Sequence, residues 1–163
     1  AGKSTIGRRL AQALELPFRD ADQEIEAAAG RTIPEIFAER GEAEFRLGER
    51  RVLARLLQHE APHVLATGGG AFIDPQTRSL MKERAVTVWL KADLDVLTRR
   101  VGRKGTRPLL AGKDPRQVLQ QLMIERYPVY AEADLAVETD DRPPFAAVET
   151  IIQALEERLK VKA

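Results

Sequence analysis

Short apolar runs alternate with longer amphipathic stretches along the chain. The apolar runs predict strands over residues 17–19, 64–67, 86–90 and 135–139. Between them, apolar residues recur at helical spacing, which predicts helices over residues 4–16, 23–29, 42–58, 74–84, 94–101, 114–130 and 143–160. Strands that alternate with helices are typical of a parallel sheet covered on both faces. We therefore expect an α/β fold with three layers, helix, sheet and helix.

Local signals mark several helix ends. Gly30 closes the second predicted helix. Thr32 and Glu35 have the T-x-x-E spacing of a capping box, which predicts the start of a short further helix. Gly41 separates this short helix from the longer one that follows. The chain shows no internal repeat and no linker, so we expect a single domain over residues 1–163.

The chain begins with A-G-K-S-T, the second half of the phosphate-binding motif G-x-x-x-x-G-K-S/T. In this motif Gly2 would let backbone N–H groups approach phosphate oxygens, Lys3 would reach the phosphates, and Ser4 would ligand Mg²⁺. The helix that follows would add its positive N-terminal end. We expect the natural molecule to carry the first strand and the first half of the loop before Ala1. A G-K-S-T string also occurs by chance in surface helices, so the motif needs support from the rest of the chain.

Two carboxylates directly follow the first predicted strand. Asp20 and Asp22 lie two positions apart, so both can face one site if the strand breaks there. The alternative is that one of them only caps the helix that follows. Behind a phosphate loop the functional interpretation is favoured, because phosphoryl transfer uses carboxylates to hold the metal ion and to orient the nucleophile.

Three glycines, Gly68, Gly69 and Gly70, follow the second predicted strand. Glycines at the end of a buried strand indicate backbone that a ligand or a helix approaches closely. Ligands of parallel α/β sheets bind beyond the carboxyl ends of the strands. The glycines are therefore expected at the same site as the phosphate motif and the two carboxylates, as is the segment from Thr139 onward.

Arginines provide further candidates. Arg46 lies near the start of its helix, where the dipole is unfavourable for a cation, so an anionic partner would explain it. From the pattern alone, an ion pair with Glu42 or Glu49 is the better interpretation. The segment 102–112 is short, basic and contains glycine, which fits either a flap that closes over a phosphate or a plain solvated loop.

Composition narrows the class of protein. The 163 residues are 44% hydrophobic and 31% charged, and 26 basic residues against 25 acidic ones give a net charge of +1. This balance argues against a general role on nucleic acids or membrane surfaces. The absence of cysteine excludes disulfides and Cys-ligated zinc. No apolar run approaches the about 18–20 residues of a membrane helix, and we expect a soluble cytoplasmic protein.

Taken together, the motifs resemble those of the shikimate kinase family, and the resemblance covers nearly the whole chain. The motifs are G-K-S-T at 2–5, D-A-D-Q-E-I at 20–25, I-x-x-I-F…G-E-x-E-F-R at 33–46, G-G-G at 68–70, R-P-L-L at 107–110 and R-x-P-x-Y at 126–130. The phosphate motif alone fits any P-loop kinase, whereas the combination is highly specific. The resemblance implies a P-loop kinase fold related to the nucleoside monophosphate kinases, with a lid near 102–113 and substrate-binding helices near 22–59.

The resemblance implies that ATP phosphorylates shikimate to shikimate 3-phosphate, on the route to chorismate and the aromatic amino acids. It assigns the ATP site to Gly2, Lys3, Ser4, Thr5, Arg100, Arg107 and Pro144, and the Mg²⁺ site to Ser4 and Asp20. It assigns the shikimate site to Asp22, Ile33, Phe37, Phe45, Arg46, Gly68, Gly69, Gly70 and Arg126. The catalytic residues would be Lys3, Asp22 and Arg107.

The resemblance also implies a role for each group. Asp22 would orient the reacting hydroxyl or take its proton, and the forks of Arg46 and Arg126 would grip the substrate carboxylate. Arg107 would close onto the phosphates and stabilise charge in the transition state. Arg100 and Pro144 would lie against the adenine. The protein is expected to be a monomer that binds no nucleic acid and no membrane.

Three other classes of protein compete with this interpretation. The nearest is another small-molecule kinase of the same fold, such as a gluconate kinase. A non-catalytic nucleotide-binding module is a second class, against which the presence of Lys3, Asp20, Asp22 and Arg107 argues. A nucleic-acid binder is the weakest alternative, because the net charge is only +1 and the sequence has no basic stripe.

Overall fold

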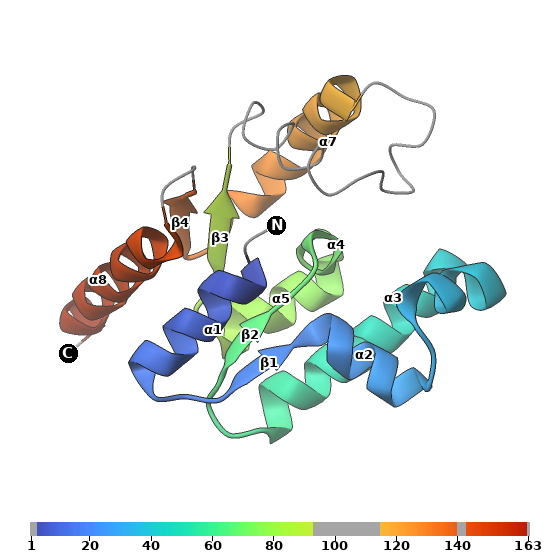
Figure 1. Cartoon of the computed structure of the whole chain (residues 1–163), viewed down its shortest axis with the longest axis horizontal. Coiled ribbons are helices and arrows are strands. Elements are labelled where there is room, and N and C mark those ends of the chain that lie inside the picture. Colours follow the sequence, from blue (N-terminus) through green and yellow to red (C-terminus); the bar gives the residue numbers. More distant parts are fainter. Residues whose placement is uncertain (1–2, 93–114, 140–142, 163) are drawn as a thin grey trace. The chain divides into compact units, whose positions relative to one another are not determined.

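The structure, a computed structural model, describes residues 3–92, 115–139 and 143–162. The chain divides into two compact units, Gly2–Thr87 and Val88–Ala163. Each unit contains a pair of short parallel strands with helices packed on them (Figure 1). The parallel pairing and the alternation of strands with helices agree with the α/β class predicted from the sequence.

The first unit begins with a helix and contains two strands. Its elements are α1 (Lys3–Leu14), β1 (Phe18–Asp20), α2 (Ala21–Ala29), α3 (Ile33–His59), β2 (Val64–Ala66), α4 (Gly69–Ile73) and α5 (Pro75–Arg84). Strands β1 and β2 run parallel, with Phe18 opposite Val64 and Asp20 opposite Ala66. Their carboxyl ends therefore lie side by side, so the segments that follow Asp20 and Ala66 start from the same edge.

The core of the first unit joins α2 and α3 to the strand β2. One cluster of buried apolar residues consists of Ile25, Ile36, Phe45, Val52 and Leu56, and a second consists of Ala21, Leu53 and Ala71. Leu65 of β2 packs against both clusters. Burial of these apolar side chains provides the main driving force that fixes α2, α3 and α4 around β2.

Helix ends in this unit follow the local signals of the sequence. Thr32 and Glu35 form the predicted capping box, in which the Glu35 N–H donates to Thr32 Oγ1 and the Thr32 N–H donates to Glu35 Oε1. Gly30 ends α2 with a φ of 67°. Gly41 has a φ of 82° and a ψ of 172°, so it breaks α3 at the predicted point. Both glycines adopt backbone conformations that side-chain-bearing residues rarely reach.

The second unit is built around the parallel strands β3 (Val88–Lys91) and β4 (Leu135–Glu138), which pair with Val88 opposite Leu135. Helix α7 (Pro115–Tyr130) contacts β3 through an edge-on contact between the Trp89 and Tyr127 rings, whose centroids are 4.8 Å apart. Helix α8 (Pro144–Lys162) packs on β4.

Three parts of the sequence prediction need comment. Strand β3 begins two residues later than predicted, and Val86 before it is 43% exposed. The helix α4 was not predicted, because its first residues are glycines, which favour loops. The predicted helix over 94–101 and the flap over 102–112 lie outside the described residues. Within the described part of the chain, no helix combines the length and apolar character needed to cross a membrane.

Candidate active site

The N-terminus of α1 meets the two carboxylates that follow β1. Ser4 Oγ donates a hydrogen bond of 3.2 Å to Asp20 Oδ2, and Lys3 Nζ lies 3.8 Å from Asp22 Oδ2. The structure therefore brings together four of the predicted site residues, from the start of α1, the end of β1 and the first turn of α2. A cation, a hydroxyl and two carboxylates converge at a helix N-terminus, which is a favourable place for a phosphate.

Asp20 has a structural task in addition to its contact with Ser4. Its Oδ1 accepts hydrogen bonds from the backbone N–H groups of Asp22 (2.9 Å) and Gln23 (3.4 Å), so Asp20 is the N-cap of α2. The capping role that the sequence left open is thus confirmed. Because only Oδ1 serves the cap, Oδ2 remains directed at the Ser4 hydroxyl.

The three glycines lie against two other site residues. A β-carbon added to Gly68 would be 3.8 Å from Asp22 Oδ1, and one added to Gly70 would be 2.6 Å from Arg46 Nη1. At Gly68 the distance is an ordinary van der Waals contact, whereas at Gly70 a side chain would collide with Arg46, so the close approach that requires glycine is at Gly70. The approaching group at Gly70 is the guanidinium of Arg46, and Gly69 and Gly70 form the first turn of α4.

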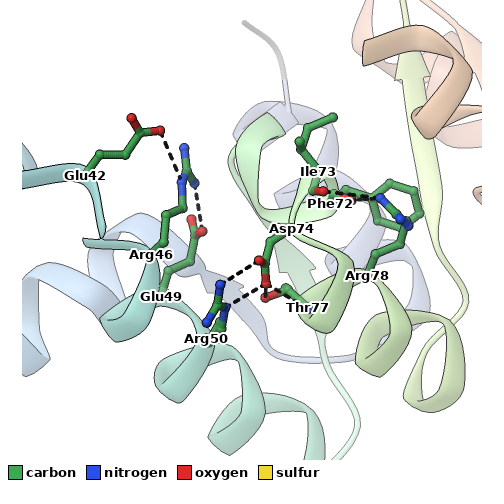
Figure 2. Close-up of polar contacts among 9 residues, drawn as sticks. All are labelled: Glu42, Arg46, Glu49, Arg50, Phe72, Ile73, Asp74, Thr77 and Arg78. Atoms are coloured by element: carbon green, nitrogen blue, oxygen red, sulfur yellow. Dashed lines mark hydrogen bonds and ion pairs between the residues drawn. The ribbon is translucent and has the colours of Figure 1, made fainter. Parts of the chain in front are cut away.

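Arg46 is held by two carboxylates of its own helix, as the sequence pattern suggested (Figure 2). Its Nη1 donates a 2.8 Å hydrogen bond to Glu49 Oε1, and its Nε lies 3.9 Å from Glu42 Oε1. The Glu42 side chain is 71% exposed, so this second pair contributes little. The Glu49 side chain is only 4% exposed, and burial raises the pKa of its carboxyl while the hydrogen bond from Arg46 lowers it. Glu49 therefore fixes the guanidinium of Arg46 beside Gly70.

The predicted apolar wall of the substrate site is assembled on α3. The Phe37 and Phe45 rings lie with centroids 4.8 Å apart, and Arg46 Cζ is 5.1 Å from the Phe45 centroid. Phe37 is 39% exposed, which is unusual for a large aromatic residue. Ile33, at the start of α3, packs against the core cluster that includes Phe45. An aromatic surface thus lies next to the only arginine of α3 that was predicted to bind substrate.

The remaining predicted site residues are not placed in this constellation. Gly2, Arg100 and Arg107 lie outside the described residues. Arg126 on α7 and Pro144 at the start of α8 belong to the second unit, as does Thr139, whose N–H and Oγ1 both donate to the Lys91 carbonyl. Thr5 is exposed on the first turn of α1.

A further polar cluster next to the site was not predicted as part of it. Arg50 donates two hydrogen bonds of 2.8 Å to the two carboxylate oxygens of Asp74, which also caps α5 through Thr77 (Figure 2). The hydrogen bonds from Arg50 are the main reason why the pKa of Asp74 falls to about 2. The sequence indicated Asp74 only as the start of a helix, because nothing in a local pattern connects it to an arginine 24 positions earlier.

The oxygen ligands at Ser4 and Asp20 suit a hard cation. In the part of the chain that the structure describes, no group of three or more His, Cys, Asp or Glu side chains is arranged to hold a metal ion. Mg²⁺ needs no such cage, because it is commonly bound by one or two protein oxygens together with substrate phosphates and water. A hydroxyl and a carboxylate oxygen 3.2 Å apart at the N-terminus of α1 therefore fit Mg²⁺.

The contact between Gly70 and Arg46 makes a testable prediction. We expect Gly70→Ala to fold, because the added methyl group meets only the far end of a flexible side chain, and to push the Arg46 guanidinium out of place. Binding of an anionic substrate at Arg46 should weaken by about tenfold, which corresponds to one lost or distorted hydrogen bond to a charged group. The effect is measured as the Michaelis constant of the variant for its anionic substrate, compared with that of the wild type.

Gly48→Ala is the matched control. Gly48 lies on the same helix as Arg46, and a β-carbon there meets nothing within 4 Å. Alanine at this helical position should raise the free energy of unfolding by about 0.5–1 kcal/mol without any change in substrate binding. Equal binding by the Gly70→Ala variant and the wild type would contradict the role given to this contact.

The chain is similar in sequence and in structure to known proteins of one family. Residues 1–156 match the family model described as shikimate kinase. The shikimate kinase of Caulobacter vibrioides is 65% identical over 154 residues, which are 94% of this chain and 76% of the relative. The Bradyrhizobium diazoefficiens shikimate kinase is 56% identical over 158 residues, covering 97% of this chain and 76% of the relative. The solved structure of the Acinetobacter baumannii shikimate kinase in complex with shikimate is 37% identical, with a TM-score of 0.87 over 96% of this chain and 88% of that one.

These matches go beyond the fold alone. A fold supports many activities, but here the sequence itself is 65% identical to a shikimate kinase over 94% of the chain. The structural match also confirms the predicted fold class, a P-loop kinase fold of the α/β type. The chain belongs to the shikimate kinase family.

Proposed function

We propose that the cluster at the start of α1 and the neighbouring face of α3 form the phosphoryl-transfer site of this kinase, which phosphorylates shikimate with ATP. The observation that carries the proposal is the 3.8 Å contact between Lys3 and Asp22. Lys3 is the lysine of the phosphate motif, whereas Asp22 lies beside Gly68, the first glycine of the run whose last member contacts Arg46. The contact therefore joins a phosphate-binding group directly to a group that can hold the acceptor hydroxyl.

Shikimate is a carboxylic acid with several hydroxyl groups, and the first unit offers groups for both. Arg46 presents a planar fork, suited to a carboxylate, next to the backbone of Gly70. Asp22 at the other end of the glycine run would accept a hydrogen bond from the hydroxyl to be phosphorylated. The Acinetobacter baumannii relative was solved with shikimate bound, which supports this class of substrate.

The reaction needs little covalent chemistry from the protein. Asp22 would orient the attacking hydroxyl and accept its proton, while Lys3 would neutralise charge on the phosphates of ATP. Ser4 Oγ and Asp20 Oδ2 would hold Mg²⁺, with Asp20 acting through water. When bound, the ion neutralises charge on the β- and γ-phosphates. Ile33, Phe37 and Phe45 would cover the apolar side of the shikimate ring.

Other roles are proposed from the family motifs. Gly2 and Thr5 would complete the phosphate-binding loop, and Arg107 on a lid over about 102–113 would close onto the phosphates. Arg126 would be the second arginine for the carboxylate, and Arg100 with Pro144 would lie against the adenine. The protein would act as a cytoplasmic monomer. Within a single domain, residues near 22–59 would form the substrate-binding region.

The proposed function is tested by measuring ADP release from ATP and Mg²⁺ with shikimate, with gluconate, and with neither. We expect release that depends on shikimate, and none above background with gluconate. Release with gluconate alone would overturn the substrate assignment in favour of another acid. ATP binding without turnover of either acid would favour a non-catalytic nucleotide-binding module.

A further inference from the structure

Helix α4 lies directly beside Arg46, but its own sequence gives it little intrinsic stability. It has five residues, two of which are glycines, and its N-cap, Gly68, has no side chain to cap it. A single helical turn is not stable alone, and each glycine costs about 1 kcal/mol relative to alanine. The backbone position of Gly70 must therefore be set by contacts from outside α4.

The buried side chains of α4 provide only part of this support. Ala71 is fully buried and Phe72 is 7% exposed, so they anchor the middle of the helix in the core. Apolar contacts are non-directional and tolerate small shifts and rotations of a short helix. A directional restraint is needed to fix the helix along its axis, and the polar groups at its C-terminal end provide one.

Two arginines donate hydrogen bonds to the C-terminal end of α4 (Figure 2). Arg78 Nη1 donates to the Phe72 and Ile73 carbonyls at 3.2 and 3.3 Å. Arg50 Nε and Nη2 donate to Asp74 Oδ2 and Oδ1, both at 2.8 Å. Asp74 is the residue that ends α4 and begins α5, so a double hydrogen bond to it restrains both helices.

Arg50 and Arg46 occupy the same face of α3. They are four residues apart, one helical turn, and their partners Gly70 and Asp74 are also four residues apart. Arg46 therefore meets the beginning of α4, and Arg50 holds the residue at its end. A shift of α4 relative to α3 that separates Arg50 from Asp74 also changes the contact between Arg46 and Gly70.

The Arg50–Asp74 pair is well placed to resist such a shift. Its geometry is bidentate, which fixes both distance and orientation, unlike a single contact between point charges. The Asp74 side chain is 13% exposed and that of Arg50 is 38% exposed, so screening by water weakens the pair without removing it. Thr77 holds the same carboxylate from α5 through its N–H (3.0 Å) and its Oγ1 (2.8 Å), so Asp74 has little freedom to turn.

We propose that Arg50 and Asp74 are positioning residues for the substrate: their double hydrogen bond holds α4 against α3 and so sets Gly70 at the Arg46 guanidinium. The inference rests on the proposed function, because it deepens the shikimate site. Among residues 3–92, the side-chain hydrogen bonds of Arg50 and Asp74 join α3 to the start of α5 and do not involve α1, which carries Lys3 and Ser4. The pair should therefore affect binding of shikimate much more than binding of ATP.

The test compares Arg50→Ala, Arg50→Lys, Asp74→Asn and the Arg50→Ala/Asp74→Asn double variant in the full-length protein. Asparagine at 74 retains the ability to cap α5, so it removes the charge of the pair while keeping the helix start. Lysine at 50 retains a positive charge but cannot make two parallel hydrogen bonds. Arg51→Ala is the matched control, since Arg51 is the exposed next residue of α3.

We expect Arg50→Ala and Asp74→Asn each to raise the KM for shikimate by about 5- to 20-fold, with the KM for ATP changed by less than about twofold. The double variant should resemble the single variants, because both remove the same interaction. Arg50→Lys should give an intermediate KM, and Arg51→Ala should leave it unchanged. Hydrogen exchange of the backbone amides of 69–73, measured without substrate, should be faster by about tenfold in Arg50→Ala.

Three outcomes would overturn the inference. One is an unchanged KM for shikimate together with faster exchange in α4, which would make the pair structural only. Another is a parallel rise in the KM values for both substrates. The third is unchanged exchange in α4. If the wild type releases no ADP with shikimate, the proposed function fails instead, and the exchange measurement still decides whether the pair holds α4.

Discussion

Asp22→Asn should lower kcat for shikimate phosphorylation by about 10²- to 10⁴-fold, the range typical of a lost general base. The amide has the shape of the carboxylate but cannot accept the proton of the attacking hydroxyl. Asp22 also pairs with Lys3 at 3.8 Å, and a phosphate can take the place of this partner when ATP binds. Binding of ATP, measured by calorimetry, should therefore remain within about threefold of the wild type.

Glu24→Gln is the control for this variant. Glu24 is in the first turn of the same helix, so it loses a similar interaction with the helix dipole, but its partners are Arg19 and Arg55. Its kcat should be close to that of the wild type. A near-normal kcat in Asp22→Asn would remove Asp22 from its proposed role.

Arg46→Ala should raise the KM for shikimate by about 10²-fold or more, because hydrogen bonds between charged groups contribute about 1.5–3 kcal/mol each. The change also leaves Glu49 buried without its hydrogen-bonded cation. Loss of Arg46 should raise the pKa of Glu49 further, since Arg46 now lowers it. Both the stability and the substrate affinity of this variant should therefore decrease. The dependence of stability on pH and a second substitution at Glu49 distinguish the two effects.

The pH dependence has a definite sign. A carboxyl group whose folded-state pKa lies above the ordinary 4.5 binds more protons in the folded state than in the unfolded state between the two values. Stability of the Arg46→Ala variant should therefore increase as the pH falls through the raised folded-state pKa of Glu49 towards the ordinary 4.5. Urea unfolding at several pH values measures this change relative to the wild type.

The double variant Arg46→Ala/Glu49→Gln separates the two effects of losing Arg46. Glutamine at 49 removes the unpaired buried charge, so stability should recover towards that of the wild type. The KM for shikimate should stay high, because the arginine fork is still absent. Recovery of the KM along with stability would show that Arg46 acts through folding and not through the substrate.

Features with local causes were predictable from the sequence. The capping box at Thr32 and Glu35, the break at Gly41 and the cap at Asp74 all depend on residues within a few positions of each other. The ion pair of Arg46 with Glu49 was predictable for the same reason, since the two are three residues apart on a helix. The burial of Glu49 was not predictable from the sequence, because it depends on how α3 packs against the rest of the unit.

Features that depend on distant contacts escaped prediction. Of the glycines at 68–70, which were expected to be approached by a ligand or a helix, Gly70 is approached closely by the Arg46 side chain. The helix that Gly69 and Gly70 open was not predicted, because the support of α4 comes from Arg50 and Arg78. Asp74 was predicted to open a helix, whereas its pairing with Arg50 was not predicted, because Arg50 lies on another element. Family motifs extended the prediction to residues such as Arg107 and Arg126, for which local patterns gave no role.

Asp20 is subject to two independent requirements. One of its oxygens starts helix α2 and the other faces the Ser4 hydroxyl. Asparagine would keep an acceptor for the helix but lose the negative charge beside Ser4, and serine would keep a cap but be too short to reach it. Selection for folding and selection for chemistry thus act on one carboxylate, and position 20 should accept fewer substitutions in functional variants than either requirement alone would allow.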